Sequence, residues 1–326
     1  MTKRRLLLPV ISVVTLLAVA NALMGLWSHR LPYYRMLEKI RTAHDPNLLI
    51  VGNSLLTGLD EPALVRAANE GGESFNPINV ATVASQPPEH KLLFNYAYKR
   101  QPSIRNLVVG IYDFQLTTLV KSRMTDLMGN RMIAVDHRFG FDEVVSSYGF
   151  GAGDQVELGV ARTLPMVANR GNVWKYVELL RRSMAAMGMP RVATNNMGRV
   201  DDFKAIESAS PETFDAEANA FLEQPDHFNP SYDSIFSTAA RAKMNIVVVI
   251  MPMSPYHRAI FYSRPSWKGY IAALDQLADR RGIRVIDASG WLPAEGNFKD
   301  HLHMNSEALH EFSLRLGSEL SHTFSR

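Results

Sequence analysis

Short, unbroken apolar runs recur along this chain, and each is followed by turn residues and then by a segment with helical spacing. The first run is Leu48-Leu49-Ile50-Val51, which stops at Gly52-Asn53-Ser54. A run of this kind is typical of a strand buried on both faces, as in a parallel sheet. Further strands are predicted at 77–81, 104–111, 245–251 and 283–286, and helices at 61–69, 87–99, 231–244, 270–281 and 306–320. Strands alternating with helices predict an α/β fold with right-handed crossovers.

Ser54 follows the first predicted strand directly. Parallel α/β sheets bind their ligands at the carboxyl ends of the strands, so Ser54 is expected at that edge. A serine on a tight turn between strand and helix has an exposed hydroxyl and a backbone N–H near a helix start, which suits a nucleophile. The alternative is a simple helix N-cap.

Asp300 and His303 stand three residues apart before the last predicted helix. In an acyl-transfer triad a carboxylate orients the histidine that activates the serine, and this spacing brings the two side chains together. Each residue also has a structural explanation, Asp300 as an acid at a helix start and His303 as an ordinary polar residue. His301 is a rival for the role of base. We expect Ser54, His303 and Asp300 to act together.

The Gly52-Asn53-Ser54 motif after an apolar strand, paired with Asp300-x-x-His303, resembles the SGNH (GDSL) hydrolase superfamily. The resemblance covers about residues 47–113 and 231–320. It implies a three-layer α/β/α sandwich with a parallel, flavodoxin-like sheet. It also implies Ser54 as nucleophile, His303 as base and Asp300 as the partner that orients it, with no cofactor.

Two other family motifs are altered here. The oxyanion-hole glycine of the second motif corresponds to Ala84, and in Gly110-Ile111-Tyr112-Asp113 a tyrosine, Tyr112, replaces the oxyanion asparagine. We expect Ala84, Tyr112 and Asn53 to line the oxyanion or substrate-binding part of the site. Losing one oxyanion donor costs about 2.7–4 kcal/mol of transition-state stabilisation, so slow catalysis is expected unless another donor substitutes.

The first 30 residues are expected to form a separate segment, with the SGNH-like domain over 31–326. Lys3, Arg4 and Arg5 precede Leu6–Trp27, which contains no charged residue. About 20 apolar residues can span a bilayer as a helix. We favour a retained N-terminal transmembrane helix over a signal peptide cleaved near Ala20-Asn21-Ala22. The expected location is the inner (cytoplasmic) membrane, single-pass, with the globular domain in the periplasm.

Between about residues 117 and 226 the alternation of strands and helices stops. This region is rich in Gly, Met, Asn and Arg, and a helix is predicted over 173–187. We interpret it as a largely helical insertion that covers the site or binds a partner.

Composition excludes several classes of site. The 35 basic and 32 acidic residues give a net charge of only +3 without long runs, which argues against a nucleic-acid partner. No cysteine is present, so disulfides and thiolate chemistry are excluded. His301 and His303 lie close together, but no further His, Asp or Glu set has ligand spacing, and no metal is expected.

Two functions are consistent with these features. The first is an exported serine acyltransferase or esterase acting on O-acetyl or similar groups of a cell-surface polysaccharide. The altered motifs and the N-terminal segment resemble the subgroup that acts beside a membrane-bound O-acyltransferase, a candidate partner. The alternative is a non-catalytic SGNH-like scaffold that binds a polysaccharide or such an acyltransferase.

Overall fold

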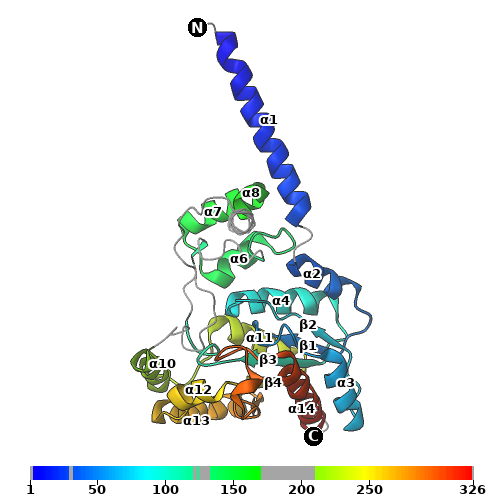
Figure 1. Cartoon of the computed structure of the whole chain (residues 1–326), viewed down its shortest axis with the longest axis vertical. Coiled ribbons are helices and arrows are strands. Elements are labelled where there is room, and N and C mark those ends of the chain that lie inside the picture. The colour runs from blue at the N-terminus through cyan, green and yellow to red at the C-terminus, as the bar shows by residue number, and fades with distance from the viewer. Residues whose placement is uncertain (1–2, 29–31, 120–122, 125–132, 170–209, 325–326) are drawn as a thin grey trace, which may run out of the picture. The chain divides into compact units, whose positions relative to one another are not determined.

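The computed structural model describes residues 3–28, 32–119, 123–124, 133–169 and 210–324 (Figure 1). The chain divides into two compact units, one of residues 1–39 with 121–194, the other of 40–120 with 195–326. The helix predicted over 173–187 lies outside the described residues.

The larger unit is built on a five-stranded parallel sheet with strand order β2-β1-β3-β4-β5. This is the flavodoxin-like order, which confirms the predicted α/β fold and parallel sheet. The strands are β1 (Leu48–Val51), β2 (Pro77–Asn79), β3 (Asn106–Ile111), β4 (Asn245–Ile250) and β5 (Arg284–Asp287). Every residue of β1 and β3 is buried, which explains why these runs are continuously apolar.

Helices cover both faces of the sheet. Figure 1 shows α4 and α14 on opposite sides of the strands; α14 packs on α3, and α4 packs on α11. The bounds are α3 (Glu61–Glu70), α4 (Pro87–Arg100), α11 (Pro230–Arg241), α13 (Pro265–Arg280) and α14 (Ser306–Phe324). Shorter elements are α10 (Pro211–Glu223), α12 (Pro255–His257), the π-helix η1 (Arg258–Tyr262) and the 3-10 helix η2 (Glu295–Asn297).

The smaller unit is helical in its described part. It contains α1 (Lys3–Ser28), α6 (Phe141–Tyr148), α7 (Ala152–Thr163) and α8 (Pro165–Ala168), and α2 (Pro32–Thr42) runs across the boundary between the units. No strand occurs in the described part of residues 117–226, in agreement with a largely helical segment.

The helix α1 runs over the segment for which a membrane span was expected. Within the described residues, however, none of the helices combines the length and the apolar character needed to cross a membrane. The transmembrane part of the predicted fold is therefore not supported by the structure.

The parallel register brings the carboxyl ends of β1, β3, β4 and β5 to one edge of the sheet. The turn that carries Ser54 follows β1 there, and the loop that carries His303 follows β5. Residues almost 250 positions apart in the chain therefore reach the same place.

Candidate active site

Ser54 lies in a tight turn immediately after β1. The amide of Leu56 donates to the carbonyl of Asn53 over 3.1 Å, and the amide of Leu55 donates to the Asn53 side-chain oxygen over 3.0 Å. Asn53 is buried, whereas Ser54 is half-buried. Among the described residues, the backbone N–H of Ser54 has no hydrogen-bond acceptor. The turn thus exposes a hydroxyl and an unused amide together.

Two glycines let this turn lie close to the sheet. A Cβ on Gly110 would lie 2.3 Å from Cδ1 of Leu56, and one on Gly52 would lie 2.7 Å from the same atom. Leu56 is 1% exposed and fills the space that both glycines leave. The side chain of Leu56 therefore packs the turn against the ends of β1 and β3.

The loop before α14 holds Asp300 and His303 in a fixed relationship. One carboxylate oxygen of Asp300 accepts the backbone N–H of Leu302 over 2.8 Å and that of His303 over 2.7 Å. An isolated antiparallel bridge joins Phe298 to Met304 around the same loop. The carboxylate is therefore oriented by the backbone before it meets the imidazole.

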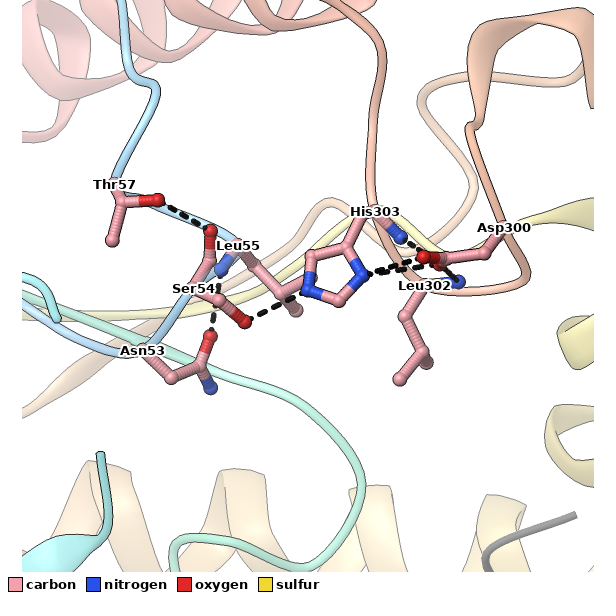
Figure 2. A network of polar contacts seen from close by, with 7 residues as sticks. All are labelled: Asn53, Ser54, Leu55, Thr57, Asp300, Leu302 and His303. Carbon is pink, nitrogen blue, oxygen red and sulfur yellow. Dashed lines mark hydrogen bonds and ion pairs between the residues drawn. The ribbon is translucent and has the colours of Figure 1, made fainter. Parts of the chain in front are cut away.

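The structure brings the three predicted residues into one hydrogen-bonded chain, shown in Figure 2. Ser54 Oγ lies 2.8 Å from His303 Nε2, and His303 Nδ1 lies 2.8 Å from Asp300 Oδ2. An ionised carboxylate can only accept a hydrogen bond, so Nδ1 carries the ring proton and donates a hydrogen bond to Asp300. Nε2 is then the acceptor for the Ser54 hydroxyl, which is the tautomer a general base requires.

The charge state of Asp300 suits this arrangement. Partial burial raises the pKa of its carboxyl, but the backbone N–H groups of His303 and Leu302 and the His303 ring lower it by more. The net pKa lies below the ordinary value, so Asp300 is ionised at neutral pH and can stabilise a protonated His303.

His301, the other candidate base, contacts His257. It is 5% exposed, and its ring stacks on His257 with centroids 5.8 Å apart and an interplanar angle of 8°. Burial, and then the neighbouring His257, lower the pKa of His301. It is His303 that meets the serine hydroxyl.

A second polar cluster, which the sequence did not indicate, lies next to His301. Asp113, directly after Tyr112 beyond β3, accepts hydrogen bonds from His257 Nε2 and from the Tyr262 hydroxyl, each over 2.9 Å. Its φ of 45° lies in the left-handed region, where residues other than Gly, Asn and Asp are rare. Nδ1 of His257 is buried and has no hydrogen-bond partner in the described part of the chain. The separation of Asp113 and His257 in sequence left no signal for this pairing.

A third set of hydrogen-bonded residues, which the sequence did not indicate, contacts the chain just after β1. Ser85 donates to the carbonyl of Gly52 over 3.0 Å, and its oxygen lies 2.8 Å from His90 Nε2. His90 Nδ1 lies 2.8 Å from the hydroxyl of Tyr232. His90 and Tyr232 are completely buried. A neutral imidazole satisfies both contacts, donating to Ser85 and accepting from Tyr232.

The three residues expected at an oxyanion or substrate site have different environments. Ala84 is exposed with a φ of 55°, a conformation that glycine adopts without steric cost, as the resemblance to the glycine motif would require. The Asn53 amide is engaged by Leu55 and by Gln115, whose side-chain oxygen it approaches to 2.9 Å. Their participation in chemistry stays a prediction.

Tyr112, expected at the oxyanion site, is half-buried directly after β3. Burial, followed by Asp113, raises the pKa of its hydroxyl, and Tyr112 in turn contributes to the raised pKa of the buried Tyr232. Within the described residues no hydrogen bond joins the Tyr112 side chain to Ser54 or His303, and its part in the oxyanion site stays a prediction.

No group of three or more His, Cys, Asp or Glu side chains among the described residues could hold a metal ion.

Comparison with protein-family models gives no match, and comparison with curated proteins gives none either. Solved structures do show similarity. A GDSL-like lipase from Bacteroides thetaiotaomicron is 10% identical, with 89% of this chain and 97% of that one covered and a TM-score of 0.39. A lipase from a goat rumen metagenome is 12% identical, with coverage of 85% and 98% and a TM-score of 0.40. A lipase/acylhydrolase from Enterococcus faecalis is 10% identical, with coverage of 85% and 96% and a TM-score of 0.38. The chain is thus similar to GDSL-type lipases and acylhydrolases at low identity.

Proposed function

We propose that this protein is a serine acyl hydrolase or acyltransferase of the SGNH type. The observation that supports the proposal is the hydrogen-bonded chain from Ser54 through His303 to Asp300. In this chain the His303 ring has the tautomer that nucleophilic catalysis needs.

The reaction follows from these positions. Ser54 Oγ attacks the acyl carbonyl carbon while its proton passes to His303 Nε2, and Asp300 stabilises the imidazolium that forms. When the tetrahedral intermediate collapses, His303 returns the proton to the departing alcohol oxygen and an acyl-serine remains. Water or an acceptor hydroxyl then attacks the acyl carbon while its proton passes to His303 Nε2. The bond between Ser54 Oγ and the acyl carbon breaks, and His303 returns the proton to Ser54 Oγ as the acid or the new ester leaves.

The proposed substrate class is O-acetyl or similar acyl groups of a cell-surface polysaccharide. What supports this finer proposal is the resemblance of the altered second and third motifs, at Ala84 and Tyr112, to the polysaccharide-acylating subgroup. A sugar hydroxyl would then compete with water for the acyl-serine. Acyl transfer to an added oligosaccharide, measured by mass spectrometry against free acetate, separates the two outcomes; hydrolysis unaffected by any acceptor would reduce the proposal to an esterase.

Export is proposed on the sequence of the first 30 residues, in which Lys3-Arg4-Arg5 precede an uncharged stretch. A reporter enzyme that works only outside the cytoplasm, fused after Arg326, should be active. Activity of a cytoplasm-only reporter at the same position would contradict export.

The direct test of the enzyme is covalent labelling of Ser54 by a fluorophosphonate. Wild-type protein should label at one site, and Ser54→Ala should not label. Ser147→Ala, which removes a serine hydroxyl bonded to its own helix, is the matched control and should label normally. A folded wild-type protein that neither labels nor hydrolyses any acyl ester would favour the non-catalytic scaffold.

A further inference from the structure

A side-chain amide, that of Gln115, lies next to the Ser54 turn on the same loop that carries Tyr112. Gln115 lies in the turn after β3, the strand next to β1, and its backbone N–H donates to the Tyr112 carbonyl over 3.2 Å. Its side chain is half-buried and meets Asn53, the residue immediately before Ser54.

The orientation of the Asn53 amide is determined by the backbone. The N–H of Leu55 can only donate, so the Asn53 atom 3.0 Å away must be its oxygen. Figure 2 shows this oxygen facing Leu55, with the amide nitrogen turned to the other side. The NH₂ group of Asn53 therefore faces Gln115.

The orientation of Gln115 follows in turn. A donor on Asn53 requires an acceptor on Gln115, which is Oε1 at 2.9 Å. The Gln115 NH₂ group is then directed away from Asn53, and it has no acceptor among the described residues. A half-buried amide with unused donors, held by the neighbour of the nucleophile, is prepared to bind a negatively charged oxygen.

The geometry points to Gln115 as the side-chain donor of the oxyanion hole, acting with the backbone N–H of Ser54. The inference rests on the proposed acyl transfer at Ser54. When Ser54 attacks, the carbonyl oxygen gains a negative charge, and the Gln115 Nε2–H and the Ser54 N–H donate to it. Asn53 is a positioning residue, because it holds the Gln115 oxygen and so turns the Gln115 nitrogen to the substrate.

The test compares fluorophosphonate labelling of Ser54 in wild-type protein and in Gln115→Ala. Loss of one oxyanion donor lowers the rate of the chemical step about 10²–10³-fold. We expect a loss of this size in the maximal labelling rate, with little change in the reagent concentration for half-maximal rate, because the donor acts in the transition state. Gln276→Ala, at an exposed glutamine of α13, is the matched control and should label as wild type.

Asn53→Asp separates positioning from folding. An aspartate still accepts from Leu55 but cannot donate to Gln115, so the Gln115 NH₂ should turn to the new carboxylate and leave the oxyanion. We expect a comparable loss of labelling rate in a protein with a normal melting temperature. A Gln115→Ala variant that labels at the wild-type rate would overturn this inference alone. Wild-type protein that neither labels nor turns over esters would instead remove the proposed function and this inference together.

Discussion

Ser85 Oγ lies 2.8 Å from Nε2 of the buried His90, and the same hydroxyl donates to the carbonyl of Gly52, which follows β1 and precedes Asn53 and Ser54. The nucleophile turn is thereby connected to a histidine that must remain neutral. Burial lowers the pKa of His90 from its ordinary 6.5 to about 3.

The first prediction concerns stability in acid. Above pH 6.5, His90 is neutral in the folded and the unfolded chain. Between about pH 6.5 and about 3 the unfolded chain binds a proton that the folded protein does not, so falling pH destabilises the fold. This single group contributes at most about 1.4 kcal/mol per pH unit.

Replacing the histidine should remove that dependence. His90→Gln should be less stable than wild type at pH 8, because it loses buried hydrogen bonds. The difference in free energy of unfolding should then shrink as the pH falls below 6.5. Urea unfolding at several pH values measures this, with His44→Gln at an exposed histidine as control. A constant difference from pH 8 to pH 4 would contradict the prediction.

The second prediction concerns the close contact between Gly110 and the side chain of Leu56. In Gly110→Ala, a Cβ 2.3 Å from Cδ1 of Leu56 would force that buried side chain to move. Overpacking of this kind costs about 1–3 kcal/mol. Because Leu56 belongs to the Ser54 turn, Ser54 labelling should slow as well. Gly159→Ala, where an added Cβ in the interior of α7 meets no atom within 4 Å, should not destabilise the protein and should leave labelling unchanged.

The third prediction distinguishes the two histidines. Asp300→Asn keeps the acceptor for the backbone amides, but its NH₂ favours the wrong tautomer of His303, and the rate should fall about 10⁴-fold. His303→Ala should abolish labelling, whereas His301→Ala should have a milder effect because it is directed to His257. Wild-type labelling in His303→Ala with none in His301→Ala would reverse the assignment of the base.

The fourth prediction concerns Asp113, which satisfies His257 and Tyr262 together. Asp113→Asn keeps an acceptor and tolerates the left-handed backbone, so it should lose about 1–2 kcal/mol of stability. Asp113→Ala leaves two buried donors unsatisfied and strains the backbone, and should lose clearly more. Urea unfolding of both variants tests this order, and equal stability of the two would contradict it.

Local sequence was sufficient to predict the five strands and the helices α3, α4, α11, α13 and α14 that pack with them, and it suggested the three triad candidates. The runs at 48–51 and 246–250 are buried on both faces, so their apolar character is visible without knowledge of their neighbours. Asp300 and His303 are three residues apart, and their pairing depends on one loop. A continuous apolar stretch also predicted a transmembrane helix, which the structure does not support.

What the tertiary structure alone decided are contacts between segments far apart in the chain. His90 with Tyr232, Asp113 with His257 and Asn53 with Gln115 depend on which strand ends lie side by side, and no local pattern encodes a hydrogen bond across such distances. Motif spacing pointed to Tyr112 because it occupies the place of the family's asparagine. In the folded chain the turn after β3 brings Gln115 to Asn53, the residue before Ser54. Sequence could suggest Ser54, His303 and Asp300 because the chemistry of these side-chain types is intrinsic, whereas a contact such as that of Asn53 with Gln115 is determined by the packing of the strands.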